Sequence, residues 1–196
     1  MTVPDTATAR SFSFGWTLDA PREQVFRAWT DPARLGWFYN PDQPIPDEPI
    51  ELDLRVGGAW RQMMVIDPDT RYVTGGVYRE IVGDERLVFA WGATDGWPKL
   101  DPADLDAGPQ VTVTFAAVGG RTELTVRMDM PATMADDGVP SWWKYAEVGW
   151  RVTVDRLAAS PELLADAPDG DRLPQADGSG SVWHPVSVTA DRGCAT

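Results

Sequence analysis

The stretch from Ser141 to Ala158 is the only long segment of this chain with clean helical periodicity. Its apolar residues recur at spacings of three and four positions, so an α-helix would gather them on one stripe. They are Trp143, Ala146, Trp150, Val154 and Leu157. A helix with such a stripe is stable only when another layer of structure covers it. The preceding chain must supply that layer, and nearly all of it has the pattern of strands.

The flanking residues mark the limits of this helix. Pro140 and Ser141 begin it, with Ser141 as a suitable N-cap, and Pro161 follows its end within a few residues. Gly149 interrupts the helix at a cost of about 1 kcal/mol in helix propensity relative to alanine. We expect a strand backbone to approach the helix closely at that glycine.

Apolar and polar residues alternate in several upstream segments, as they do in strands with one buried face. These segments are residues 10–18, 51–56, 59–66, 72–82, 86–91, 111–117 and 122–130. Glycine pairs provide turns at Gly57-Gly58 and Gly119-Gly120. A third pair, Gly75-Gly76, lies inside a strand and suggests a bulge or bend.

Two short helices are expected between the first and second strands. Asp19 or Ala20 caps the first, with Pro21 in its first turn, and Asp31-Pro32 begins the second. The second ends in three consecutive aromatic residues, 37–39, of which at least one should project into a cavity or solvent. Residues 40–50 contain four prolines and form a loop that would act as a lid.

The predicted fold class is therefore α+β, with a curved antiparallel sheet of about six or seven strands around the long C-terminal helix. An antiparallel sheet has one apolar face to cover, and the long helix is the element that remains to cover it. A strongly twisted sheet curls around such a helix, and a gap can persist between them at the end where the loops meet. We expect that gap to be the ligand site.

The charge of the chain argues against several classes of partner. With 17 basic and 30 acidic residues, its net charge of −13 repels phosphate backbones and anionic lipid heads. We expect no nucleic-acid partner and no membrane insertion, since no run approaches the eighteen or so apolar residues that span a bilayer. The single cysteine excludes a disulfide framework, and with no signal peptide visible we expect a cytoplasmic location.

Ten tryptophans exceed ordinary usage, and aromatic surface beyond what a core needs often lines a pocket. A Trp-rich core is the alternative interpretation of the same residues. Methionines would add adaptable apolar lining, and a glutamate on the long helix could orient a ligand. The candidate ligand-binding residues are Trp37, Tyr39, Trp60, Met63, Tyr78, Trp91, Trp97, Met128, Met130, Trp143, Glu147 and Trp150.

The sequence offers no catalytic constellation. The only histidine, His184, and the only cysteine, Cys194, both lie close to the C-terminus, so the preceding domain has no Ser-His-Asp triad or His/Cys metal cluster. Nucleotide-binding glycine motifs are also missing. We therefore expect no cofactor and no metal. A buried Glu or Tyr beside a ligand carbonyl could still act as an acid or base.

Six runs together resemble the AHSA-like branch of the START/SRPBCC superfamily. In order, they are PREQVFRAWTDPARLGWF, LRVGGAW, GGVYREIVGDERLVFAW, VTVTF, RTELTVRM and GWRVTVDRL. The resemblance implies the helix-grip fold of the birch-pollen allergens, a cupped antiparallel sheet that grips the C-terminal helix with an apolar cavity between them. It covers about residues 10–159.

The domain organisation follows from the extent of this resemblance. We expect a flexible N-terminus at 1–9, a helix-grip ligand-binding domain at 10–159 and a Pro/Gly/Asp-rich extension at 160–196. Within the extension, Val182 to Val188 with Trp183 forms a small apolar group. Both a disordered tail and one docked onto the domain remain open at this point.

The leading functional hypothesis is binding of an apolar, aromatic or polyketide-like small molecule, in natural-product metabolism or self-resistance. Superfamily members suggest an alternative, a cyclase or aromatase that acts by acid/base chemistry on a natural-product intermediate. A second alternative is a protein-interaction domain of the co-chaperone type, which would expose a large apolar patch. The protein is expected to be a monomer or a weak homodimer.

Overall fold

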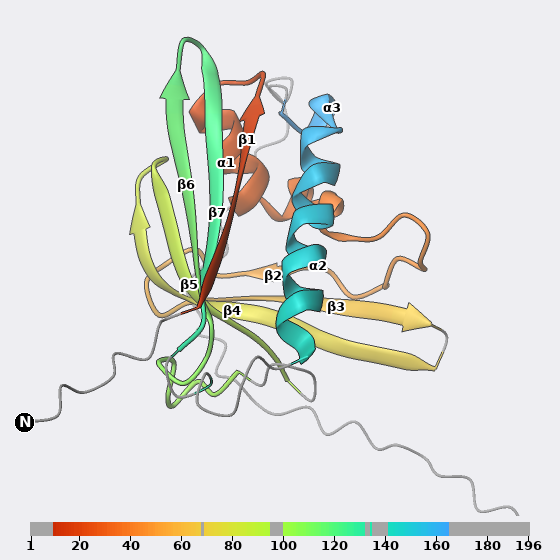
Figure 1. The fold of residues 1–196 in the computed structure, drawn as a ribbon. Helices are drawn as coiled ribbons and strands as arrows, with labels where there is room; N and C mark the ends of the chain where they lie inside the picture. The colour runs from red at the N-terminus through yellow and green to blue at the C-terminus, as the bar shows by residue number, and fades with distance from the viewer. Residues whose placement is uncertain (1–9, 68, 95–99, 132–133, 135–140, 165–196) are drawn as a thin grey trace, which may run out of the picture.

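A seven-stranded antiparallel sheet bent around one long helix forms the described part of the chain in a computed structural model (Figure 1). The structure describes residues 10–67, 69–94, 100–131, 134 and 141–164. The strand order is β1-β7-β6-β5-β4-β3-β2. The strands are β1 (Ser11–Leu18), β2 (Glu51–Leu52), β3 (Ala59–Asp67), β4 (Thr70–Val82), β5 (Arg86–Thr94), β6 (Gln110–Val118) and β7 (Arg121–Asp129). The predicted α+β helix-grip architecture is thus confirmed.

In the β6–β7 hairpin, the alternation of apolar and polar residues determines which face of the sheet is buried. Val111, Val113 and Phe115 are buried on β6, while the residues between them are less buried. Phe115 pairs with Leu124 across the hairpin, so the buried faces of both strands coincide. Gly119 and Gly120 join the strands at φ values of 57° and 84°. Two left-handed residues in a two-residue loop match the twist of the strands, and glycine adopts that conformation without strain.

The long helix α2 (Ser141–Ala158) lies inside the bend of the sheet. Its predicted apolar stripe is buried throughout, from Trp143 to Leu157. Trp143 packs on Phe12 of β1 with 4.9 Å between ring centroids. Further along, Trp16 donates a hydrogen bond from Nε1 to Asp155 at 2.7 Å. The first strand and the last long helix therefore hold each other in place. A short helix, α3 (Pro161–Leu164), follows.

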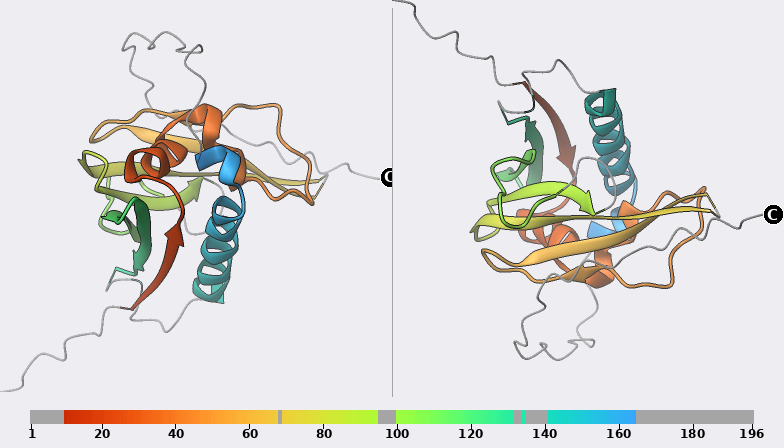
Figure 2. Two further views of the ribbon diagram at one scale, coloured as in Figure 1. Left: turned by 90° about the horizontal axis from the view of Figure 1, so that it is seen from above. Right: turned by 90° about the horizontal axis from the view of Figure 1, so that it is seen from below.

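Two short helices cover the part of the sheet that α2 leaves open, as the views from above and below show (Figure 2). Helix α1 (Arg22–Thr30) packs Phe26 and Trp29 against Phe115 of β6. The 3-10 helix η1 (Pro32–Phe38) begins as predicted at Asp31, whose side chain accepts from the backbone of Ala33 at 3.0 Å.

The start of α1 differs from the prediction. Pro21 occupies the N-cap position with extended backbone, and no side chain caps the helix there. Proline satisfies this position without a side-chain acceptor, because its fixed φ suits the entry to a helix. The predicted cap at Asp19 or Ala20 is therefore wrong.

The predicted strand at 51–56 is also mostly wrong, because only Glu51 and Leu52 pair with β3. The chain turns at once, and the backbone N–H of Asp53 donates to the carbonyl of Ala59 at 2.9 Å. Leu54 and Val56 are consequently exposed although they alternate like strand residues.

Gly75-Gly76 makes no bulge, because both residues pair in register with β3 and with β5. The irregularity in β4 lies between Tyr78 and Glu80 instead. The two glycines instead allow Trp60 of the neighbouring strand to pack closely against β4. A Cβ on Gly76 would lie 2.6 Å from Nε1 of Trp60 and 2.8 Å from the ring of Phe89. Only glycine lets the Trp60 indole lie this close to β4.

Gly149 corrects another expectation, since no strand backbone approaches it. A Cβ at this position would meet no atom within 4 Å, and the residue is exposed. None of the described helices is long and apolar enough to cross a membrane. The apolar group at Val182–Val188, together with His184 and Cys194, lies outside the described residues.

Candidate functional site

A cavity of about 500 Å³ lies between α2 and the inner face of strands β3 to β5. It occupies the gap that the bent sheet leaves beside the helix, and the end of η1 contributes one wall. Its lining residues are Phe38, Trp60, Gln62, Met64, Thr70, Arg71, Tyr72, Thr74, Trp91, Tyr145, Ala146, Gly149, Trp150 and Thr153.

Aromatic rings form the inner walls of this cavity. Trp91 meets Trp150 edge to face, with 5.8 Å between centroids and a 70° angle between the rings. Trp60 contacts Phe38 at 5.7 Å. These rings come from β5, α2, β3 and η1, so elements distant in sequence converge on one site. Edge and face contacts of this kind fix ring orientation and leave flat apolar walls.

Arg156 anchors the backbone at Trp37 and Phe38, next to the wall of the cavity that the Phe38 ring forms. Its Nε donates to the carbonyl of Trp37 at 2.9 Å, and one Nη donates to the carbonyl of Phe38, also at 2.9 Å. The same Nη donates to the hydroxyl of Thr153 at 3.0 Å. Partial burial lowers the pKa of the Arg156 guanidinium, yet arginine stays protonated in proteins. The C-terminal carbonyls of η1 thus receive charge-assisted hydrogen bonds from α2.

Polar groups enter the cavity from β3 and β4. Thr74 already donates its hydroxyl proton to the carbonyl of Gly92 at 3.1 Å. Burial raises the pKa of the Tyr72 phenol, which is therefore neutral at physiological pH. Nε2 of Gln62 and Nε1 of Trp150 are buried without a hydrogen-bond partner in the described part of the chain.

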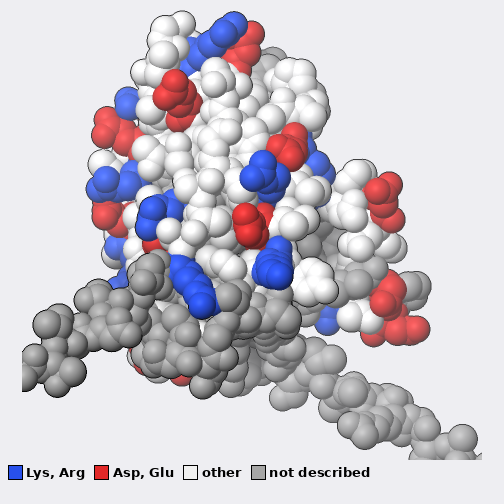
Figure 3. All heavy atoms as spheres, in the orientation of Figure 1, with Lys and Arg blue, Asp and Glu red and all other residues white. Residues whose placement is uncertain are grey.

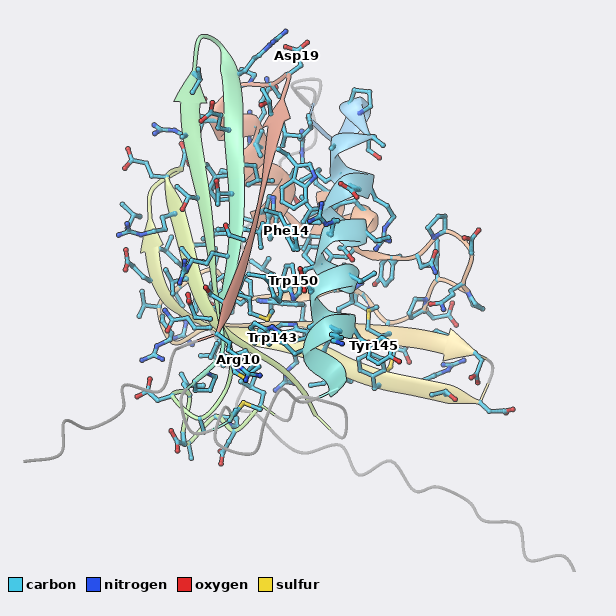
Figure 4. All side chains as sticks on the ribbon, in the orientation of Figure 1. Arg10, Phe14, Asp19, Trp143, Tyr145 and Trp150 are labelled. Atoms are coloured by element: carbon cyan, nitrogen blue, oxygen red, sulfur yellow. The ribbon has the colours of Figure 1, made fainter. Side chains whose placement is uncertain are left out.

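The mouth of the cavity lies beside the first half of α2. Tyr145 is 74 % exposed and lines the rim, and Figure 4 shows it on the side of the helix toward β3 and β4. Gly149 lies one turn further along and leaves the rim open, since it has no side chain. Arg71 and Thr70, both exposed, stand at the opposite rim. No residue of the loop 40–50 lines this cavity, so its predicted role as a lid finds no support in the described contacts.

A second, much smaller cavity of about 10 Å³ lies beneath the first and shares Phe38, Trp60 and Gln62 with it. Tyr78 lines only this smaller space. Its volume is at the lower limit for one water molecule. The larger cavity is therefore the one that can admit an organic ligand.

The structure brings three of the predicted ligand-binding residues to the cavity, namely Trp60, Trp91 and Trp150. The others lie elsewhere. Trp37, Tyr78, Met128, Met130 and Trp143 are buried in the core away from the large cavity, and Tyr39, Met63 and Glu147 are half-buried without lining it. Trp97 lies outside the described residues. Of the seven tryptophans whose side chains the structure describes, three line the cavity and three others, Trp29, Trp37 and Trp143, are buried in the core away from it, while Trp16 is half-buried.

Sequence reasoning missed several lining residues, although one signal was available. Trp60, Gln62 and Met64 share the inner face of β3 by strand alternation, whereas Met63 points to the other face. Phe38 is one of the consecutive aromatic residues 37–39, of which at least one was expected to project into a cavity, but the sequence did not indicate which one. Among the described residues, no three His, Cys, Asp or Glu side chains gather as a metal site.

Comparison with known proteins agrees with this architecture. A family model described as Activator of Hsp90 ATPase homolog 1-like protein matches residues 19–161. A search of curated proteins gave no match.

Solved structures share the fold at low sequence identity. Mll3558 from Rhizobium loti is 22% identical with a TM-score of 0.58, and the match covers 77% of this chain and 96% of that one. The AHSA1-like protein from Aeromonas hydrophila is 20% identical with a TM-score of 0.58, covering 83% and 100%. DynU16, from the dynemicin biosynthetic locus, is 22% identical with a TM-score of 0.55, covering 78% of this chain and 47% of DynU16.

Proposed function

This chain belongs to the family of Activator of Hsp90 ATPase homolog 1-like proteins, and we propose that it binds an apolar aromatic small molecule in the cavity between α2 and strands β3 to β5. One observation carries the proposal: a cavity of about 500 Å³ whose inner walls are the rings of Phe38, Trp60, Trp91 and Trp150. Ligand sites of small molecules usually measure about 300–1,000 Å³ and are lined by apolar and aromatic side chains with a few polar groups.

The walls suit a flat ligand better than a flexible chain. Trp91 and Trp150 are held edge to face, and Phe38 is fixed through Arg156, so the aromatic surfaces are in place before any ligand arrives. Preorganised walls reduce the entropy lost on binding. Met64 adds an adaptable side chain at the cavity, which lets ligands of related shape fit.

We further propose that the natural ligand is polyketide-like and belongs to natural-product metabolism or self-resistance. DynU16 has the same fold and comes from a natural-product biosynthetic locus, which motivates this choice of ligand class. The protein would act in the cytoplasm as a monomer or weak homodimer. On the face in Figure 3, acidic and basic residues are interspersed, so that face offers no continuous basic surface to nucleic acid.

The acid/base enzyme interpretation is less well supported by the cavity. No Asp, Glu or His is among the described residues that line it. Glu147 is half-buried outside it, and the neutral Tyr72 phenol is a hydrogen-bond donor rather than a base. Proton transfer requires a group with a pKa near the working pH beside the reacting atom.

The protein-interaction hypothesis would use exposed apolar side chains. Tyr145, Val148 and Val152 are exposed along one side of α2. These three side chains form a short row, of which Tyr145 also lines the rim of the cavity, whereas the cavity has four aromatic walls. The observation therefore favours small-molecule binding as the primary activity.

Intrinsic fluorescence tests the proposal directly, because three tryptophans line the cavity. Titration with polyketides, flavonoids and fatty acids should quench emission saturably for the aromatic classes. Native mass spectrometry of protein purified from its own host should show a co-purifying aromatic compound. Absence of saturable quenching by every class, together with an unliganded mass, would rule out the proposed function.

A further inference from the structure

Indole rings and hydroxyl groups occupy different parts of the large cavity along β4. Trp60 of β3 and Trp91 of β5 both pair with Gly76, one from each side of the strand, and both line the cavity. Between Gly76 and the β3–β4 turn, the inner face of β4 presents three side chains with hydroxyl groups. They are Thr74, Tyr72 and Thr70, and all three line the cavity.

Tyr72 lies in the outer part of the cavity, between the indole rings and the rim. It is four residues from Gly76, which corresponds to about 13 Å along a strand that rises about 3.4 Å per residue. Tyr72 pairs with Met64 of β3, which lines the cavity from the same face. A ligand that fills the cavity from the indole rings toward the mouth therefore passes Tyr72.

The Tyr72 hydroxyl has no partner within the described part of the protein, yet the cavity gives access to it. Burial is the only cause that raises the pKa of this phenol, so no described charge or hydrogen-bonding group acts on it. The side chain is half-buried. Unlike the nitrogens of Gln62 and Trp150, its oxygen is not among the described buried atoms that lack a partner. The hydroxyl is therefore open to a hydrogen bond from inside the cavity.

Two other hydroxyl groups of the lining already have partners in the protein. Thr74 donates its proton to the carbonyl of Gly92 at 3.1 Å, and Thr153 accepts a hydrogen bond from Arg156 at 3.0 Å. At the rim, Thr70 and Tyr145 are exposed and stay in contact with solvent. Tyr72 differs from all four, because a ligand would cover a hydroxyl that nothing in the described structure satisfies.

Resting on the proposed function of this cavity, we infer that the aromatic ligand carries an oxygen atom at the end nearer the mouth, where it accepts a hydrogen bond from the Tyr72 hydroxyl. Solvent that enters through the open mouth can satisfy this hydroxyl before a ligand binds. A phenolic or carbonyl oxygen on the ligand replaces that hydrogen bond. A hydrocarbon of the same shape covers the phenol and leaves it unpaired, which weakens binding.

Two flat probes of nearly equal shape test the inference, trans-4-hydroxystilbene and trans-4-methylstilbene. Equilibrium dialysis against the full chain gives the association constant of each probe. Because the methyl compound is the more hydrophobic, the ratio of the two constants is compared between the wild type and Tyr72→Phe. The ratio of hydroxyl to methyl compound should fall by about twofold to tenfold in Tyr72→Phe, which is the effect of one hydrogen bond.

Tyr39→Phe is the matched control, since this tyrosine is half-buried without lining the cavity, and it should keep the wild-type ratio. If both stilbenes bind and Tyr72→Phe leaves the ratio unchanged, the inference is overturned and the proposed function survives. Equal weakening of both probes by Tyr72→Phe also overturns the inference, because the hydroxyl then makes no distinction between them. If neither stilbene nor any aromatic compound of the fluorescence screen binds, the proposed function itself fails.

A second measurement decides the question if Tyr72→Phe does not fold. The wild-type chain, labelled with ¹³C at the Cζ atom of tyrosine, reports on each phenol by nuclear magnetic resonance. The Tyr72 Cζ resonance should shift more with trans-4-hydroxystilbene than with trans-4-methylstilbene, because only the first forms a hydrogen bond with the hydroxyl. Equal shifts with both bound probes would overturn the inference.

Discussion

Arg156 on α2 donates a hydrogen bond from Nε to the carbonyl oxygen of Trp37, 119 residues earlier in the chain, at 2.9 Å. A second hydrogen bond reaches the carbonyl of Phe38, which lines the cavity. The end of η1 is thereby tied to the helix that forms the opposite wall. If the cavity binds the proposed ligand, stability and ligand affinity should both depend on this side chain.

We expect Arg156→Met to lower the free energy of unfolding by about 1–3 kcal/mol, because two carbonyls lose their charge-assisted donors. Ligand affinity should fall as well, since Phe38 loses its anchor. Urea denaturation and calorimetric titration measure the two effects. Lys144→Met on the exposed side of α2 serves as the control and should leave both unchanged. An affinity that is unaffected in Arg156→Met would show that Phe38 does not depend on this contact.

Replacing Gly76 by alanine should lower the free energy of unfolding, whereas replacing Gly149 by alanine should raise it. At Gly76 the added Cβ would lie within 3 Å of the Trp60 and Phe89 side chains and of the Ala90 carbonyl oxygen. Overpacking of this kind costs about 1–3 kcal/mol or more. At Gly149 the Cβ meets nothing within 4 Å, and alanine should stabilise the helix by about 0.5–1 kcal/mol. Thermal denaturation of the two variants measures both changes, and a stabilised Gly76→Ala would refute the packing around Trp60.

Tyr78 should make the protein lose stability at high pH. Burial raises the pKa of its phenol well above the ordinary value. Below about pH 10 the folded and unfolded states both keep the proton. Above that pH only the unfolded state releases it, so the free energy of unfolding falls by up to about 1.4 kcal/mol per pH unit.

Urea denaturation between about pH 9 and 12 measures this dependence, in the range set by the phenol pKa. Tyr78→Phe should show a shallower decline than the wild type. Tyr145→Phe, at an exposed position, is the matched control. If the free energy of unfolding fell equally steeply with pH in the wild type and in Tyr78→Phe, the burial of this phenol would be contradicted.

The parts of the fold that follow from local pattern were predictable from the sequence. The stripe from Trp143 to Leu157 and the alternation on β6 and β7 depend only on the spacing of neighbouring residues. Leu54 and Val56 alternate in the same way, yet the chain turns there because Asp53 bonds to Ala59. A pattern of six residues cannot distinguish a strand from a strand-like turn.

The site was less predictable because contacts between distant segments form it. The carbonyl of the cavity residue Phe38 accepts a hydrogen bond from Arg156 on α2, and Trp60 fits against β4 only because residue 76 is a glycine. Gln62 is buried beside the cavity although glutamine is mostly found at protein surfaces, so its residue type gave no indication of this position. Three of the predicted tryptophans line the cavity, but the sequence does not tell which of them do so.

The central claim, that the ligand occupies the space between α2 and strands β3 to β5, is tested most directly at Gly149. A leucine there meets no protein atom near its Cβ and projects into the mouth of the cavity, whereas alanine leaves the mouth open. Titration with the tightest aromatic ligand from the fluorescence screen should give wild-type affinity for Gly149→Ala and an affinity reduced about fivefold or more for Gly149→Leu, the loss expected from a steric penalty of about 1–3 kcal/mol. Equal affinities for the two variants, with both folded, would place the ligand elsewhere and contradict the claim.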